Sequence, residues 1–221
     1  MKTFTFPDRN EAGRALARQL SSYADRNDVV VLALPRGGVP IGFEIAHALR
    51  APLDIFLVRK LGVPMQEELA MGAIASGGTM VLNESLVEQL RITREQIDQV
   101  RAHETRELER REQAFRPRHT MVPVIDRICI LVDDGLATGS TMHAAVLALK
   151  KQNPAKVVVA VPVASRDVCE EFQALTDEVV CLYTPEPFMS VGQWYDDFTQ
   201  LTDEDVRDHL ERAAHQMVHE F

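Results

Sequence analysis

Two adjacent aspartates, Asp133 and Asp134, stand between an apolar run at 127–132 and a loop of small and hydroxylated residues. Like charges crowded at the end of a strand are unfavourable unless a cation or hydrogen-bond donors lie over them. Glycines in the loop allow close approach of the backbone, and hydroxyl groups can donate hydrogen bonds. The loop residues that carry this chemistry are Gly135, Ala137, Thr138, Gly139, Ser140 and Thr141.

The loop leads into a predicted helix, whose N-terminal amides and dipole favour a phosphate group. Carboxylates repel a phosphate, but they accept hydrogen bonds well from a vicinal diol. A phosphate cup beside two carboxylates therefore predicts a ligand of the ribose 5-phosphate type. Asp133 and Asp134 would hold the ribose, and the loop would hold the phosphate.

Three competing interpretations of the loop fit less well. A nucleoside triphosphate loop requires GxxxxGK[ST], and no lysine follows Gly139. A phosphorylated receiver domain would place its paired aspartates near the N-terminus of the domain, whereas two strong strands come first here. A simple capped turn between strand and helix would account for Thr138 or Ser140, but not for two neighbouring carboxylates.

Apolar strands alternate with amphipathic helices along most of the chain, which is typical of a parallel sheet with right-handed crossovers. The expected strands are 28–34, 53–58, 127–132, 156–163 and 178–183, with a short pair at 70–75 and 79–83 hinged on Gly77 and Gly78. The expected helices begin after Asp8 and Thr202 and cover 39–50, 142–152 and 166–175. The predicted fold class is α/β, an open, mainly parallel twisted sheet with helices on both faces.

Two segments depart from this alternation. Residues 84–118 contain no glycine, equal numbers of acidic residues and arginines, and a thin apolar stripe. This pattern predicts one or two long helices that project from the core, either solvated or forming a dimer. Residues 184–200 are aromatic and irregular. We expect a single domain over 1–221, with a helical insertion at about 84–118.

The run "ILVDDGLATGST" resembles the phosphoribosyl-pyrophosphate signature of the type I phosphoribosyltransferases: an apolar strand, two acidic residues and a loop that closes on Thr-Gly-x-Thr. In the order of strands the resemblance extends over about residues 28–183. It implies that the donor is phosphoribosyl pyrophosphate with Mg²⁺, the ion being held mainly through the ligand and not directly by protein atoms. The implied reaction transfers the 5-phosphoribosyl group to a nitrogenous base, with release of pyrophosphate.

The resemblance assigns roles to further residues. "LALPRGG" stands where the family has its pyrophosphate loop, which assigns Arg36, Gly37 and Gly38 to the pyrophosphate. "FLVRKLG" adds Arg59 and Lys60, and the segment 61–72 corresponds to a flexible loop that closes over the site. The segment 184–200 corresponds to the hood over the acceptor base. Its aromatic residues, Phe188, Trp194 and Tyr195, would stack on a flat ring or pack the hood's own small core.

The chain also departs from the family. Ala137 occupies the position where the hypoxanthine–guanine type has a carboxylate, so the acid/base group is unassigned. A small residue at that place is also seen in adenine-type members. The alternative function is a non-catalytic regulator that senses phosphoribosyl pyrophosphate. A phosphatase or phosphotransferase would need a nucleophile or metal cluster that the sequence does not offer.

The net charge and the composition of the chain limit its possible partners and its location. The net charge is −9, which argues against nucleic acid as the main partner. No apolar run approaches the roughly 20 residues that span a bilayer. The N-terminal residues lack an apolar signal region, so a cytoplasmic protein is expected. Cys129, Cys169 and Cys181 show no CxxC spacing and are predicted free thiols.

Two remaining inferences concern partners and histidines. Members of the family commonly form homodimers, and the expected acceptor is a small molecule. His215 and His219 have the spacing of helical metal ligands, but a third ligand is missing, so exposed histidines are expected. His143 lies near the predicted phosphate cup, and the Ser-His-Asp type of hydrolysis is unsupported because no GxSxG occurs.

Overall fold

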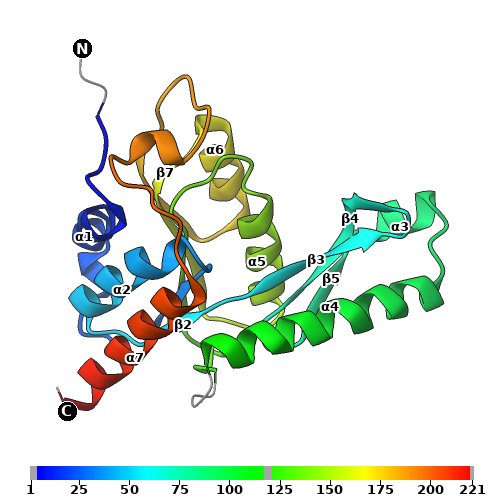
Figure 1. Ribbon diagram of the computed structural model, residues 1–221, viewed down its shortest axis with the longest axis horizontal. Coiled ribbons are helices and arrows are strands. Elements are labelled where there is room, and N and C mark those ends of the chain that lie inside the picture. The colour runs from blue at the N-terminus through cyan, green and yellow to red at the C-terminus, as the bar shows by residue number, and fades with distance from the viewer. Residues whose placement is uncertain (1–3, 117–120, 220–221) are drawn as a thin grey trace.

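The computed structural model describes residues 4–116 and 121–219, and it is built around a five-stranded parallel sheet (Figure 1). The order of strands is β2-β1-β6-β7-β8, and every neighbouring pair is parallel. The strands are β1 (Val29–Ala33), β2 (Leu53–Ile55), β6 (Ile128–Val132), β7 (Lys156–Val163) and β8 (Glu178–Tyr183). The predicted fold class is confirmed.

Helices cover both faces of this sheet, because side chains alternate along each buried strand. Val31 and Ile130 point to the face covered by α1 (Arg9–Gln19) and α2 (Gly38–Leu49). Leu32 and Leu131 point to the opposite face, against α5 (Ser140–Lys150) and α6 (Arg166–Leu175). The central strands β1 and β6 are buried along their whole length, which explains their uninterrupted apolar sequences.

A second, three-stranded antiparallel sheet projects from the core as an arm (Figure 1). It consists of β3 (Val58–Val63), β4 (Gln66–Ala75) and β5 (Thr79–Leu82). The predicted pair hinged on Gly77 and Gly78 is β4 with β5, and both glycines have positive φ. Two helices follow, α3 (Glu84–Gln89) and the long α4 (Arg94–Phe115), which returns the chain to the core.

One expectation about this region was wrong. Residues 53–58 are not one strand, because the chain leaves the central sheet after Ile55 and enters the arm at Val58. Phe56 and Leu57 are buried at the junction of the two sheets, so the apolar run continues although the pairing partner changes. Most of residues 61–72, the segment expected to be a flexible loop over the site, belong to the paired strands β3 and β4, which turn at 64–65; that this segment closes over the site stays a prediction.

The C-terminal part returns to the main body. The segment 184–200 is irregular apart from a 3₁₀ turn, η2 (Gly192–Trp194), and α7 (Asp203–His219) then packs against α2 and α4. Val206 and Leu210 of this helix are buried, and His215 is exposed, as expected. The side chains of Met217 and His219 lie outside the described residues. Of the helices in the described part of the chain, none has the length and apolar character to cross a membrane.

A buried ion pair fastens the arm to the central sheet. Nε of Arg116, directly after α4, lies 3.0 Å from Oδ1 of Asp54 in β2. Nη2 of Arg116 donates to the carbonyl oxygen of Ile55 (3.1 Å), and the amide of Val122 donates to Oδ2 of Asp54 (2.8 Å). Burial raises the pKa of the Asp54 carboxyl, and the Arg116 charge opposes that rise.

We expect Arg116→Met to lower the free energy of unfolding by about 3 kcal/mol or more at pH 7, because it leaves a buried carboxylate without its cation. The loss should shrink towards pH 4: without Arg116 the folded-state pKa of Asp54 rises further, and protonation then removes the unpaired charge. Urea denaturation at both pH values measures this. Arg110→Met, which breaks an exposed pair with Glu107, serves as the control and should change stability by about 0.5 kcal/mol or less. Equal losses in the two variants would contradict a role for the buried pair.

Candidate active site

The paired aspartates lie at the carboxyl end of β6, which is in the middle of the central sheet. Ligands of open parallel sheets bind at this edge. The amide of Asp134 donates to Oδ1 of Asp133 (2.8 Å), which fixes the first carboxylate against the start of the loop. The amide of Leu136 then donates to the carbonyl oxygen of Val163 in β7 (2.9 Å), so the loop is anchored to the neighbouring strand.

The predicted phosphate cup forms where the loop turns into α5. Gly139 is the N-cap of α5 and has a φ of 66°, which is the left-handed region that favours glycine. Because glycine has no side chain with which to cap the helix, the first-turn amides face the loop. The side chains of Thr138, Ser140 and Thr141 are exposed around this turn. The arrangement offers backbone and hydroxyl donors to an anion.

The predicted pyrophosphate loop, between β1 and α2, lies directly against the aspartates. A Cβ atom on Gly37 would stand 2.1 Å from Oδ2 of Asp134, and one on Gly38 would stand 2.4 Å from the carbonyl oxygen of Val132. Only glycine permits this approach. The peptide bond between Pro35 and Arg36 is cis. The two loops come together because β1 and β6 are neighbouring parallel strands with the same direction.

Arg36 itself is turned outward. Its Nη1 lies 3.7 Å from Oδ1 of Asp203, the first residue of α7, and both side chains are largely exposed. Such a pair contributes little to stability and leaves the guanidinium free to change partner.

A residue that the sequence did not single out reaches the site from the start of α1. Nε and Nη2 of Arg9 lie 3.0 and 2.9 Å from Oδ2 of Asp134. The sequence predicted the beginning of this helix from its capping pair, Asp8 and Glu11, and the Asp8 side chain does accept from the Glu11 amide. No local signal marked the following arginine as part of the site.

The electrostatics of the pair follow from burial and from this arginine. Burial raises the pKa of Asp133 well above its usual range, and the neighbouring Asp134 charge adds to that rise. Burial also raises the pKa of Asp134, but the Arg9 guanidinium opposes the rise by its charge and its hydrogen bonds. Asp134 is therefore the carboxylate of the pair that more readily stays ionised.

The hood segment packs on the loop, chiefly through its own core. Trp194 and Tyr195 are buried, and Phe188 stacks on Trp194 with 6.3 Å between ring centroids. The Tyr195 hydroxyl donates to the carbonyl oxygen of Asp134 (2.6 Å). These aromatic residues could either stack on a flat ring or pack the hood's own core, and the contacts in the structure are those of packing. Val191, which the sequence did not indicate, lies over Gly135, where a Cβ would meet its Cγ1 at 2.7 Å.

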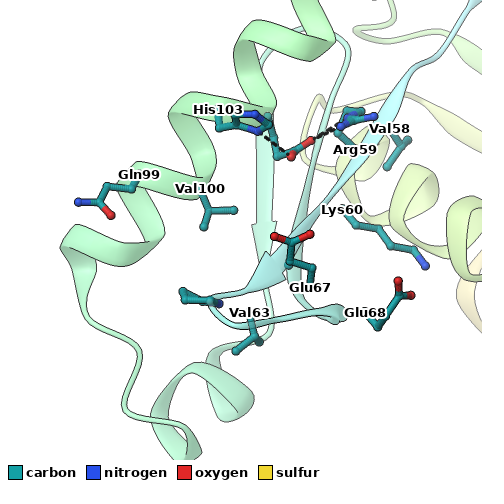
Figure 2. A pocket seen from close by; sticks show the side chains of 12 residues that line it. Val58, Arg59, Lys60, Val63, Glu67, Glu68, Gln99, Val100 and His103 are labelled. Atoms are coloured by element: carbon teal, nitrogen blue, oxygen red, sulfur yellow. Dashed lines mark hydrogen bonds and ion pairs between the residues drawn. The ribbon is translucent and has the colours of Figure 1, made fainter.

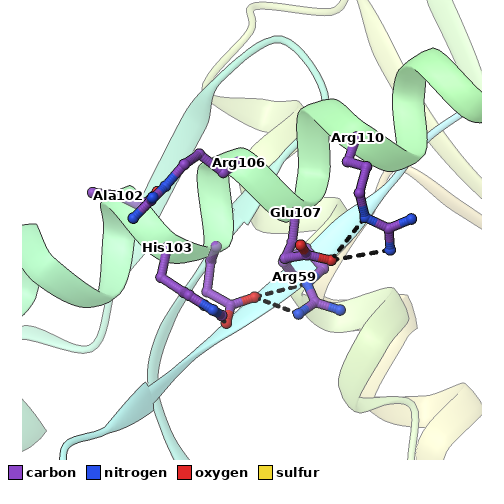
Figure 3. A network of polar contacts seen from close by, with 7 residues as sticks. Arg59, Ala102, His103, Arg106, Glu107 and Arg110 are labelled. Atoms are coloured by element: carbon purple, nitrogen blue, oxygen red, sulfur yellow. Dashed lines mark hydrogen bonds and ion pairs between the residues drawn. The ribbon is translucent and has the colours of Figure 1, made fainter.

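Arg59 and Lys60 are neighbours on β3 and therefore point to opposite sides of the arm. Figure 2 shows Arg59 reaching α4, whereas Lys60 points away from that helix. Nη2 of Arg59 lies 2.6 Å from Oε2 of Glu104, and Glu104 also contacts Nδ1 of His103 at 3.1 Å. One turn further along α4, Glu107 pairs with Arg110 (Figure 3).

Two hollows flank β3. The one in Figure 2, of about 670 Å³, lies between the arm strands and α4 and has both acidic and basic lining residues, including Arg59 and Glu67. The other, of about 360 Å³, is mostly apolar and lies between the arm and α5. Lys60 lines it together with Ser140 and His143 at the N-terminal turn of α5. Lys60 lines both hollows and is the one of the two cations whose hollow reaches the N-terminal turn of α5, whereas Arg59 is engaged by the arm's own helix.

We expect Gly37→Ala to lower the free energy of unfolding by about 1–3 kcal/mol, since the added methyl would overlap the Asp134 carboxylate. The backbone at Gly37 (φ −60°, ψ −38°) suits alanine, so the cost is steric alone. The matched test is Asp134→Ala, which removes the atoms in conflict. In that background Gly37→Ala should cost almost nothing, as measured by urea denaturation. The same cost in both backgrounds would contradict the contact.

Comparisons with known proteins agree with this geometry. The family model described as "Phosphoribosyl transferase domain" matches residues 6–183. Proteins of two Mycobacterium tuberculosis strains, CDC 1551 / Oshkosh and H37Rv, provisionally described as phosphoribosyl transferases, are 47% identical over 208 residues. These alignments cover 94% of this chain and 47% of each relative, so the chain spans about half the length of the curated relatives it matches.

Among solved structures, the crystal structure of TT1426 from Thermus thermophilus superposes with a TM-score of 0.84 at 39% sequence identity. The match covers 95% of this chain and 99% of that one, so it includes the arm and the hood as well as the central sheet. With the family model matching most of its length, the chain belongs to the phosphoribosyl transferase family.

Proposed function

We propose that the chain binds phosphoribosyl pyrophosphate with Mg²⁺ and transfers the 5-phosphoribosyl group to a nitrogenous base, releasing pyrophosphate. The observation that carries the proposal is the contact between Gly37 and the Asp134 carboxylate. It makes the pyrophosphate loop, the paired carboxylates and the N-terminus of α5 one continuous surface. A ligand with a pyrophosphate, a diol and a 5-phosphate presents matching groups in that order.

Each group then has a role in the reaction. Asp133 and Asp134 accept hydrogen bonds from the ribose hydroxyls and favour the positive charge that develops at the anomeric carbon. The amides of Gly37 and Gly38, with Arg36, stabilise the negative charge of the departing pyrophosphate. The bond from the anomeric carbon to the pyrophosphate oxygen breaks, the acceptor nitrogen forms the new bond, and that nitrogen gives up its proton. Catalysis is then mostly positioning and electrostatics.

The donor set of this site suits a Mg²⁺ ion that arrives with its ligand. Within residues 4–116 and 121–219, no group of three or more histidine, cysteine or acidic side chains is arranged to hold a metal. Mg²⁺ commonly keeps several waters and binds through substrate phosphates, and in this role it neutralises pyrophosphate charge.

The acceptor class stays open between purines and pyrimidines, and the proposed assembly is a homodimer. Ala137, in the place of the acidic residue found in some members, supplies no proton acceptor beside the ribose. A nitrogenous base that loses its proton readily in water would need the least help from the protein.

The first test is calorimetric titration of phosphoribosyl pyrophosphate with Mg²⁺ into the wild type and into a double variant, Asp133→Asn with Asp134→Asn. We expect the wild type to bind and the double variant to lose at least about 100-fold in affinity, since two charged hydrogen-bond acceptors are removed. Circular dichroism confirms that the variant is folded. A folded wild type without affinity for the donor would end the phosphoribosyl proposal. Binding without pyrophosphate release for any base would instead favour a regulator that senses the donor.

A second test separates Lys60 from Arg59. Lys60→Met should weaken donor binding about tenfold, because it removes a cation that faces the phosphate cup. Arg59→Met should leave affinity within about twofold, since the guanidinium of Arg59 is paired with Glu104 on the other side of the arm. Calorimetry of both variants under one set of conditions makes the comparison. The reverse order of effects would show that Arg59 leaves Glu104 to bind the pyrophosphate, as the family resemblance implies.

A further inference from the structure

Arg9 is held in place by contacts on each part of its guanidinium. Nε and Nη2 lie 3.0 and 2.9 Å from one oxygen, Oδ2, of Asp134. Nη1 donates to the carbonyl oxygen of Thr199 (3.0 Å), and Cζ lies 3.9 Å above the Phe198 ring. The side chain is only 10% exposed. A surface arginine that happened to meet a carboxylate would not be enclosed in this way.

The Arg9 contacts distinguish the two oxygens of the Asp134 carboxylate. Oδ2 is taken by Arg9, whereas Gly37 lies beside the whole carboxylate, since a Cβ there would meet Oδ2 at 2.1 Å and Oδ1 at 2.9 Å. Oδ1 makes neither of the Arg9 contacts. If the donor binds as proposed, Oδ1 is the oxygen that can accept from a ribose hydroxyl while Oδ2 keeps its cation.

We propose that Arg9 is a positioning residue of the donor site, which orients the Asp134 carboxylate through Oδ2 and presents Oδ1 to the ribose. This role rests on the proposed function. Nothing in the comparisons assigns a role to this residue. Arg9 acts through Asp134 and touches neither the transferred group nor the leaving group.

The contacts of Arg9 also connect the donor site to the hood. Phe198 and Thr199 follow the hood's 3₁₀ turn, and Tyr195 donates to the main chain of Asp134. The N-terminal segment pairs with the same region, since the amide of Phe6 donates to Trp194 and the amide of Asp196 donates to Phe6 (both 2.8 Å). A carboxylate that is tied to the hood in this way keeps one orientation, which lowers the entropy lost on binding.

The charged and titratable groups that face Asp134 are few. Asp133 precedes it, Arg9 reaches it from α1, and the Tyr195 hydroxyl reaches it from the hood, with a pKa raised by burial and by the Asp134 charge. Hydrogen bonds from Thr199 lower the pKa of Asp197, and the Arg9 charge adds to that lowering. Arg9 is thus the cation that opposes the two buried carboxylates, and its removal must raise the pKa of Asp134 further.

The first experiment needs no donor. Thermal unfolding of the wild type, Arg9→Met and the control Arg14→Met is followed between pH 4 and pH 7. Arg14 lies on the same helix, pairs with Glu11 and Glu44, and is half exposed. A folded-state pKa above the unfolded value makes stability fall as pH rises. The loss of thermal stability that Arg9→Met causes relative to the wild type should therefore be larger at pH 7 than at pH 4. The loss caused by Arg14→Met should stay small at both pH values. If Arg9→Met lowers thermal stability equally at both pH values, Arg9 contributes only packing, and the proposal is overturned.

The second experiment measures donor affinity by calorimetry in a double-mutant cycle of Arg9→Met with Asp134→Asn. We expect Arg9→Met alone to weaken binding at least tenfold, Arg9→Lys to recover part of the loss, and Arg14→Met to match the wild type. In the Asp134→Asn background Arg9→Met should have no further effect, because its influence passes through that carboxylate.

The outcomes separate the two proposals. Wild-type binding with unchanged or tighter binding by Arg9→Met would overturn the role of Arg9 and leave the proposed function intact. If Arg9→Met weakens donor binding as much in the Asp134→Asn background as in the wild type, the role of Arg9 is also overturned, since Arg9 would then act on the ligand or elsewhere. A wild type that does not bind the donor would overturn the proposed function. The donor-free pH experiment would in that case still show whether Arg9 controls the charge of Asp134.

Discussion

Two carboxylates, side by side and largely withdrawn from water, are the constraint around which the rest of this molecule is organised. Burial raises the pKa of both, and the charge of Asp134 raises that of Asp133 further. Two contacts offset that cost: the amide of Asp134 donates to Asp133, and Arg9 binds Asp134, while the absence of a side chain on Gly37 leaves space for the Asp134 carboxylate. Helix α1, the loop after β1 and the hood therefore meet at the two carboxylates, because these charges need partners there.

The arm is stabilised by a different set of interactions. Arg59 is paired with Glu104 and Glu107 with Arg110, and the attachment of the arm depends on the buried pair of Asp54 and Arg116. These pairs lie within the arm or at its base and leave Arg59 engaged away from the phosphate cup. Lys60 is different, since it faces the N-terminal turn of α5, and this side of β3 joins the arm to the phosphate cup.

Periodic and local features of the sequence were sufficient for much of the fold. The buried strands were predicted from their apolar runs, whereas the joint site of the loops that hold Gly37 and Asp134 was implied by the family resemblance and not by the periodicity. The change of sheet after Ile55 was missed because Phe56 and Leu57 stay buried while the pairing partner changes. Arg9 was missed because its partners lie 125 and 190 residues away, at Asp134 and Thr199, and no local pattern reports such a contact.

The same long separation has a consequence for the order in which the molecule is made. Ribosomes deliver a chain from its N-terminus, and early segments fold with whatever has already emerged. The α1 segment and the paired aspartates can meet once β6 has been synthesised, but Phe198 and Thr199 follow only after β7, α6 and β8. Until then the Arg9 guanidinium has one of its partners and a water-exposed flank. A nascent chain that stalls before the hood would carry an assembled sheet with an unfinished ligand cleft, so the site is completed only after the sheet.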